Sequence, residues 1–327
     1  MKVLVTGGAG FMGSWLVDAL ILLGHDVTSV DNLSGGYRRN VNPVCRFVKR
    51  DLRDDVDRLV KGQDVIFHLA AYAAEGQSVF SPKEINDINI RPMNNLLVAA
   101  VNHGIKKFVF TSSMAVYGAQ RAPFHEGMTR KPEDPYGCSK SYCEQMLEIF
   151  SRTYGFKSCI IRPHNVYGPR QNIADPYRNV LGIWMNMVMR GKAPYVYGDG
   201  AQVRAFSYIE DIVGPMAAAL QPNATGIVNL GGAVHTTINE ACRTLLEVMG
   251  SDLRPVHLEA RPCEVKIAYC TTRKSETDFG FRQRHSLAQG LAKMLRWVNQ
   301  VGTSKPSYRI PLEIIKNAPR VWRERMI

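Results

Sequence analysis

The segment Gly7-Gly8-Ala9-Gly10-Phe11-Met12-Gly13 constrains the fold more than any other part of the sequence. It follows a short apolar stretch, Lys2–Thr6, and precedes a helical pattern, Phe11–Leu23. A strand, a glycine turn and a helix in this order are typical of a dinucleotide-binding βαβ unit. Gly7 and Gly10 permit a tight turn that a pyrophosphate can approach closely, and Gly13 lets the helix pack on the sheet. The helix N-terminus adds positive partial charge for the phosphates.

The second predicted strand, Asp26–Val30, ends next to an acid. Asp31 stands 18 positions after Gly13, close to the spacing at which a carboxylate binds the adenosine ribose hydroxyls. A carboxylate there repels a 2′-phosphate, so the pattern favours NAD over NADP. The neighbouring Arg38 and Arg39 leave NADP as an alternative.

Strand-like and helix-like patterns alternate through the first half, which predicts parallel strands with helices on both faces. The expected fold is therefore an α/β, Rossmann-type doubly wound sheet. After Gly168-Pro169 the alternation stops, so we expect a domain over 1–168, a returning strand near 227–231, and a smaller substrate domain over 169–327. The other expected strands are Arg46–Lys49, Asp64–Phe67, Phe108–Thr111, Ser158–Arg162 and Ile227–Leu230, and the other helices Glu84–His103, Tyr136–Tyr154, Tyr177–Arg190, Thr237–Met249 and Leu287–Gln300.

Composition narrows the class of partner and compartment. The net charge is +12 over 327 residues, but Lys and Arg are scattered, so we expect no nucleic acid. A basic cleft for a nucleotide diphosphate suits this charge. The seven cysteines show no metal-ligand spacing, which predicts reduced thiols, no metal and a cytoplasmic location. No apolar run approaches the ~20 residues that span a bilayer, so we expect no membrane partner.

Further motifs resemble those of one family in their order along the chain. They are Asp51-Leu52, His68-Leu69-Ala70-Ala71, Ser112-Ser113, Tyr136-Gly137-Cys138-Ser139-Lys140, Arg162–Pro169 and Tyr197–Arg204. With the glycine turn, they resemble the extended short-chain dehydrogenase/reductases, and within them the UDP-galactose 4-epimerase branch. The resemblance extends to about residue 300. It implies an NAD-dependent nucleotide-sugar enzyme with a UDP-sugar substrate, and a homodimer formed through Glu84–His103 and Tyr136–Tyr154.

Tyr136 and Lys140 are the predicted centre of the chemistry. They lie four positions apart on one face of a helix. A phenol titrates near pH ~10 when free, and a nearby ammonium favours its deprotonated form. Such a tyrosine can act as a general base towards a sugar hydroxyl. By resemblance, Ser113 binds and relays the proton of the reacting alcohol, and Lys140 also holds the nicotinamide ribose.

The resemblance also implies two sets of binding residues. Those expected at the cofactor are Gly7, Gly10, Phe11, Met12, Asp31, Asn32, Asp51, Leu52, Leu69, Ala70, Ala71, Asn89, Tyr136, Lys140 and Pro163. Those expected at the substrate are Ser113, Asn165, Asn179, Val180, Val196, Tyr197, Arg204 and Arg261. Arginine suits phosphate because its planar fork forms two hydrogen bonds at once.

The implied reaction is epimerisation at C4 of a nucleotide diphosphate sugar through a transient 4-keto sugar. Alternatives within the family are a nucleotide-uronate 4-epimerase, a 5-epimerase, or another oxidoreductase or dehydratase. Net turnover of NAD would identify a redox enzyme. A non-catalytic dinucleotide sensor is a third class, which the intact set of Ser113, Tyr136 and Lys140 argues against.

Several positions depart from the family pattern. Met114-Ala115 replaces the Asp-Glu pair of the 4,6-dehydratases, so we expect no dehydratase activity. Ala73 replaces a lysine near the cofactor pyrophosphate, while Ala205 and Cys263 replace a usual Asp and Gly. Glu75 lies where a side chain can reach the sugar or remain in solvent. Ala268, or Tyr269 after a one-residue shift in register, is expected to limit the size of the sugar.

Overall fold

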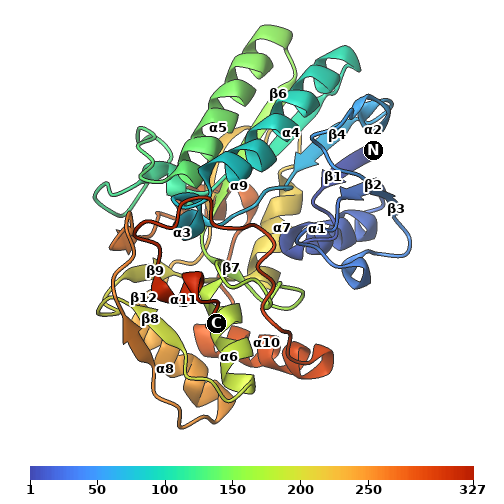
Figure 1. Ribbon diagram of the computed structural model, residues 1–327. Coiled ribbons are helices and arrows are strands. Elements are labelled where there is room, and N and C mark those ends of the chain that lie inside the picture. Colours follow the sequence, from blue (N-terminus) through green and yellow to red (C-terminus); the bar gives the residue numbers. More distant parts are fainter.

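The computed structural model describes residues 1–327 and is built on a seven-stranded sheet in which all strand pairs are parallel (Figure 1). The strand order is β11-β6-β5-β4-β1-β2-β3. The chain reverses its direction of progress across the sheet next to β1, as in doubly wound folds. The expected Rossmann-type fold is confirmed. The strands are β1 (Lys2–Thr6), β2 (Asp26–Asp31), β3 (Arg46–Lys49), β4 (Val65–His68), β5 (Lys107–Thr111), β6 (Lys157–Pro163) and β11 (Gly226–Leu230).

Helices cover both faces of this sheet because its strands are apolar on both sides. On one face, α1 (Phe11–Leu22) packs with α7 (Ile209–Ala218) over a core that includes Val5 and Phe67. On the other, α4 (Pro82–Asn102) and α5 (Pro135–Tyr154) lie side by side.

The rest of the chain forms a smaller layer below the carboxyl ends of the strands (Figure 1). Its apolar core surrounds the buried Trp184 and is built from α6 (Val180–Met189), α8 (Ile238–Met249) and α10 (Leu287–Val301). Short strands complete it: β7 (Val166–Tyr167), β8 (Tyr195–Tyr197), β9 (Val203–Ala205), β10 (Ser207–Tyr208), β12 (His235–Thr237), β13 (Val256–Leu258) and β14 (Ile267–Ala268). The short helices are η1 (Arg38–Asn40), α2 (Asp57–Val60), α3 (Glu75–Ser78), η2 (Met114–Tyr117), α9 (Arg273–Phe279) and α11 (Arg320–Arg323).

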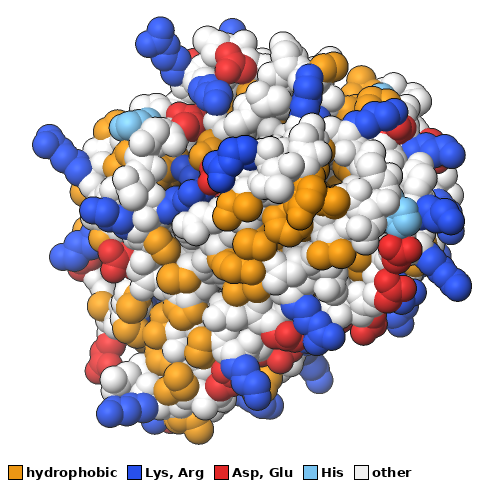
Figure 2. All heavy atoms as spheres, turned by 90° about the horizontal axis from the view of Figure 1, so that it is seen from above, with side chains coloured by type: hydrophobic (Ala, Val, Ile, Leu, Met, Phe, Trp, Pro, Cys, Tyr) orange, Lys and Arg blue, Asp and Glu red, His pale blue; other side chains and the backbone are white.

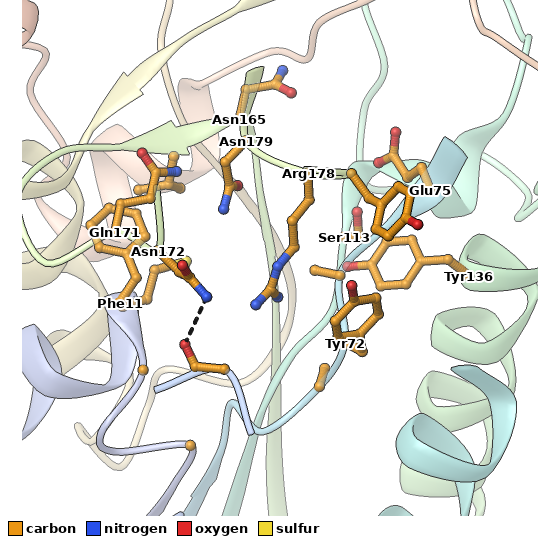
Figure 3. Close-up of a pocket in the computed structure, with 18 of the residues that line it drawn as sticks. Phe11, Tyr72, Glu75, Ser113, Tyr136, Asn165, Gln171, Asn172, Arg178 and Asn179 are labelled. Atoms are coloured by element: carbon orange, nitrogen blue, oxygen red, sulfur yellow. Dashed lines mark hydrogen bonds between the residues drawn. The ribbon is translucent and has the colours of Figure 1, made fainter. Parts of the chain in front are cut away.

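Helix α6 begins three residues later than the sequence pattern suggests. The backbone of Asn179 is left-handed, with φ 65°, and the Asp175 carboxylate accepts a hydrogen bond from the Tyr177 amide at 3.0 Å. Together they hold residues 175–179 as a turn. This turn directs the side chains of Arg178 and Asn179 towards the sheet (Figure 3).

The proposed boundary at residue 168 remains a prediction, and two later helices lie on the large sheet. Helix α7 packs on α1, and α9 packs on β11. Both helices belong to residues 169–327 but pack on the large sheet, so this part of the chain contributes to both layers.

Residues 303–327, which we call the C-terminal strap, cross the molecule between the two layers (Figure 1). The Gln77 side chain donates to the Ile310 carbonyl at 2.9 Å, and the Ser307 amide donates to the Ala174 carbonyl at 2.7 Å. Near the end of the strap, the buried ring of Trp322 packs edge-on against Tyr177, with 5.2 Å between ring centroids. The strap therefore contacts both layers.

The surface carries its basic side chains in scattered positions. On the face in Figure 2, Lys and Arg lie around the whole outline, separated by acidic and uncharged surface. None of the helices combines the length and apolar character that crossing a membrane requires. All seven cysteines are free thiols.

Candidate active site

A cavity of about 450 Å³ lies between the carboxyl ends of the sheet and the smaller layer. Every residue predicted to bind cofactor or substrate lines it, except one. The lining residues are Gly7, Gly10, Phe11, Met12, Asp31, Asn32, Asp51, Leu52, Leu69, Ala70, Ala71, Ser113, Tyr136, Lys140, Pro163, Asn165, Asn179, Val180, Val196, Tyr197, Arg204 and Arg261. Their division between cofactor and substrate remains a prediction.

The exception is Asn89, which is buried and does not line the cavity. Its Nδ2 donates to Ser139 Oγ at 3.1 Å, and its Oδ1 accepts from the Tyr72 amide at 2.8 Å. Asn89 therefore supports the segment after β4 and does not face the cavity.

The glycine turn forms a cradle in which side chains do not fit. Gly7 has φ +70°, and a Cβ built on it would lie 2.8 Å from the Ala70 amide nitrogen. A Cβ on Gly13 would collide with the Gly7 carbonyl. Gly10 precedes α1 with no side-chain cap, so the first amides of this helix are available to a ligand. The turn thus fits the pyrophosphate of a dinucleotide.

Asp31 ends β2 at the edge of this cradle. Its carboxylate accepts hydrogen bonds from the Leu33 amide at 2.7 Å and the Ala9 amide at 3.1 Å. Burial raises the pKa of Asp31, and those amides oppose the rise. Arg38 and Arg39 do not line the cavity, because they stack on Phe47 and Tyr37. They therefore do not supply the cation that a 2′-phosphate requires.

At the other end of the cavity, the N-terminus of α5 positions Tyr136 and Lys140. The Asp134 side chain caps this helix by accepting from the Gly137 amide at 2.8 Å. Tyr136 and Lys140 are 5% and 4% exposed, one turn apart. Lys140 Nζ donates to the Thr111 carbonyl at 2.8 Å, which fixes it at the end of β5. Ser113 follows that strand, and its Oγ accepts from the Ala115 amide at 3.1 Å.

Burial dominates the proton affinities here. It raises the pKa of Tyr136, with a further rise from the nearby Glu75 carboxylate, while Ser113 acts in the opposite direction. Burial also lowers the pKa of Lys140 to about 8. The net shift of the Tyr136 pKa in the protein alone is therefore upward, and the expected role of Lys140 in lowering it stays a prediction. Desolvation disfavours the phenolate form of Tyr136.

A buried ion pair supports the segment after β5 that carries Ser112 and Ser113. Glu144 of α5 is fully buried and accepts from Arg162 Nε at 2.8 Å and Nη2 at 2.6 Å. The same carboxylate accepts from Ser112 Oγ at 2.5 Å and Arg130 Nη1 at 3.0 Å. The network links α5, β6 and the residue before Ser113. Sequence reasoning did not find it, because its members lie far apart in the chain.

The smaller layer contributes the arginines expected at the substrate. Arg204 donates to the carbonyls of Val203 at 2.9 Å and Val265 at 2.6 Å. Arg261 pairs with Glu264 at 2.7 Å and lies 4.6 Å from the centroid of the Tyr197 ring. Both guanidinium groups line the cavity and are already held by the protein.

Glu75 of α3 lines the main cavity and a smaller adjoining one of about 60 Å³. Its carboxylate has no hydrogen-bond or ion-pair partner within the protein. Glu75 is exposed to these cavities, and the surrounding protein raises its pKa by desolvation, a rise that Arg204 and Arg261 oppose. Met114, Ala115 and Ala268 line the same small cavity.

Tyr269, in contrast, stacks on His235 at 4.5 Å and lines neither cavity. Of these two residues, the structure therefore places only Ala268 in the wall of the small cavity.

Other lining residues were missed by sequence reasoning. The Arg178 side chain extends into the cavity between Phe11 and Tyr72 (Figure 3). Trp322 and Ile327 of the C-terminal strap also line it. For Arg178, the only sequence signal was its position beside Asn179.

A glycine cradle on a doubly wound sheet, with Ser113, Tyr136 and Lys140 at the far end of one cavity, defines an NAD-dependent enzyme of the short-chain dehydrogenase/reductase type. Residues 3–231 match the NAD dependent epimerase/dehydratase family. The chain belongs to that family, as its motifs suggested, and is an epimerase-type enzyme that uses NAD.

Named relatives agree over most of the chain. A putative UDP-glucose 4-epimerase of Methanocaldococcus jannaschii is 35% identical over 90% of this chain and 98% of its own length. The UDP-glucose 4-epimerase of Thermus thermophilus in complex with NAD shares 31% identity and a TM-score of 0.87, covering 92% of this chain and 100% of that one. The UDP-N-acetylglucosamine 4-epimerase of Methanobrevibacter ruminantium, in complex with UDP-N-acetylmuramic acid, shares 33% identity and a TM-score of 0.86, covering 92% and 99%.

Proposed function

We propose that the protein epimerises a nucleotide diphosphate sugar at C4, with a UDP-hexose as substrate and a 4-keto sugar as transient intermediate. The observation that carries this proposal is the grouping of Ser113, Tyr136 and Lys140 at one end of the cavity, next to Met114 and Ala115. The first three side chains can move a hydroxyl proton. The last two offer no acid or base for eliminating water from the sugar.

Each residue of this group has a distinct task. The deprotonated oxygen of Tyr136 takes the proton of the sugar C4 hydroxyl and later returns it. Ser113 orients that hydroxyl, and Lys140, fixed to the Thr111 carbonyl, holds the nicotinamide end of the cofactor. Bound NAD supplies the hydride acceptor and, when oxidised, a positive charge that favours the phenolate. Tyr136 needs that charge, because burial raises its pKa in the protein alone.

The smaller layer is suited to the nucleotide diphosphate. Arg204 and Arg261 bring two guanidinium groups to one wall, and planar forks of this kind bind phosphate with paired hydrogen bonds. Asn165 lies beside them, donating to the Ala205 carbonyl at 3.1 Å. Asn179, Val180, Val196 and Tyr197 complete the proposed substrate site.

A neutral sugar fits the cavity better than a uronate. The unpaired Glu75 carboxylate lines both the main cavity and its small extension. A sugar carboxylate beside an ionised Glu75 would meet like charge, which disfavours its binding. This observation favours the hexose over the nucleotide-uronate alternative.

We also propose a cytoplasmic homodimer. Helices α4 and α5 pack side by side and leave Val98 and Ile149 exposed on their outer surface. Apolar side chains on two adjacent helices suit an isologous helical interface. Light scattering on the parent protein and on Ile149→Lys tests this, with a shift to monomer expected in the variant and an unchanged mass contradicting it.

The decisive experiment follows UDP-galactose and UDP-glucose by chromatography while NADH is monitored. We expect interconversion without accumulation of free NADH. Tyr136→Phe should lower turnover by about 10²–10⁴-fold, the usual contribution of general base catalysis. Tyr269→Phe is the control, because Tyr269 lines neither cavity. Net NADH formation, or a 4-keto-6-deoxy sugar as product, would contradict the proposal.

A further inference from the structure

Arg178 has a role that the proposed chemistry does not explain. Its side chain is 15% exposed and extends into the main cavity (Figure 3). Nε donates to Asp175 Oδ2 at 2.8 Å, and Asp175 also accepts from the Tyr72 hydroxyl at 3.3 Å. The guanidinium carbon lies 4.8 Å from the centroid of the Tyr72 ring. An acid and an aromatic face therefore hold this fork in one orientation.

The fork reaches across to the glycine cradle. A Cβ built on Gly35 would lie 2.8 Å from Arg178 Nη2, so the guanidinium contacts the loop after β2. That loop lies directly on the cradle, because the Tyr37 amide donates to the Ala9 carbonyl at 2.9 Å. A Cβ on Gly36 would lie 2.6 Å from the same carbonyl group. Arg178 thus spans the gap between the cradle and Tyr72, which follows β4.

The unused hydrogen-bonding capacity of Arg178 points into this gap. Only Nε has a partner within the protein, so both Nη groups remain available to a ligand. The cradle itself offers backbone amides and no cation. A dinucleotide that runs from Asp31 to Tyr136 carries its two phosphates past the cradle, between those ends. A cation near two negative charges in a partly buried site adds to the stabilisation that backbone amides provide.

We propose that Arg178 binds the diphosphate bridge of NAD, so that the smaller layer takes part in holding the cofactor. The amides of the cradle contact the phosphates from the side of the sheet, and the Nη groups of Arg178 contact them from the opposite side. Asp175 and Tyr72 position the fork. This inference concerns the cofactor and stands whatever sugar the enzyme uses.

The test measures ligand affinity rather than turnover. Protein stripped of cofactor is titrated calorimetrically with NAD, ADP-ribose and adenosine, for the parent, Arg178→Gln and Arg178→Lys. Charge-assisted hydrogen bonds to phosphate predict an affinity loss of about 10- to 100-fold for NAD and ADP-ribose with Arg178→Gln. Adenosine, which has no diphosphate, should bind the variant and the parent equally. The affinity of Arg178→Lys for NAD and ADP-ribose should lie between those of the parent and Arg178→Gln, because lysine keeps the charge but lacks the planar guanidinium group.

The chain offers a closely matched control in Arg170→Gln. Arg170 belongs to the same loop, pairs with Asp18 at 2.7 Å and stacks on Trp15 at 4.7 Å, but does not line the cavity. Its replacement should leave all three affinities unchanged. Since Arg178→Gln leaves Asp175 unpaired, the double variant Asp175→Asn/Arg178→Gln removes that strain, and thermal melting verifies its fold.

Three outcomes would overturn the proposal. The first is an unchanged affinity of Arg178→Gln for ADP-ribose. The second is an equal loss for adenosine and ADP-ribose, which would mean that Arg178 supports the loop rather than the phosphates. The third is a loss confined to UDP, measured with NAD bound, which would assign Arg178 to the substrate.

Discussion

The buried Glu144–Arg162 pair allows a quantitative prediction about stability. In Glu144→Gln the side chain keeps its shape but loses its charge, and its amide group faces the guanidinium of Arg162, which is 1% exposed. The carboxylate accepts four hydrogen bonds, from Ser112, Arg130 and twice from Arg162. A fully buried cation left without its partner costs about 3–5 kcal/mol. That is a large part of the ~5–15 kcal/mol by which domains are stable.

Thermal denaturation followed by circular dichroism measures this cost. We expect the midpoint of Glu144→Gln to fall by on the order of 10 °C. Glu148→Gln is the control, because Glu148 lies one turn further along α5 and also pairs with Arg130, but is 38% exposed. Exposed ion pairs contribute only about 0–1 kcal/mol to stability, so the midpoint of this variant should change little. Replacing both partners, as Glu144→Leu/Arg162→Met, should recover much of the loss. Equal midpoints for Glu144→Gln and Glu148→Gln would refute the reasoning.

Three further predictions concern the cavity. Glu75→Gln removes a carboxylate that raises the pKa of Tyr136. The pKa of Tyr136 should therefore fall, and the acidic limb of the plot of kcat/KM against pH should move to lower pH. Glu133→Gln, at an exposed position, is the control, and an acidic limb that stays in place in Glu75→Gln would contradict this prediction. Ala268→Tyr fills the small cavity and should depress turnover of UDP-N-acetylglucosamine far more than that of UDP-glucose, and equal effects would exclude Ala268 as the size limit. Asp31→Ala should weaken NAD binding by about 1–3 kcal/mol through lost ribose hydrogen bonds, measured by calorimetry, whereas an unchanged affinity would show that the carboxylate only braces the turn.

The sequence predicted local features well because each depends on neighbouring residues. The glycine turn, the acid at the end of β2 and the helical spacing of Tyr136 and Lys140 all follow from short-range rules. Arg178 was missed because its place in the cavity depends on a left-handed turn at Asn179 and on Asp175. The burial that raises the pKa of Tyr136 in the protein alone could not be predicted from the sequence for a related reason. Four-residue spacing says which side chains share a face, but desolvation depends on the whole tertiary structure.

The C-terminal strap has a consequence for the order in which the protein is made. Residues 303–327 leave the ribosome after every strand of the large sheet, and chains fold from the N-terminal side as they emerge. The strap can dock only when both layers exist, because it bonds to Gln77 in one and Ala174 in the other. We therefore expect a nascent molecule to pass through a stage in which Trp322 does not yet wall the cavity. During that stage the cofactor can enter a more open cleft, which the strap then covers.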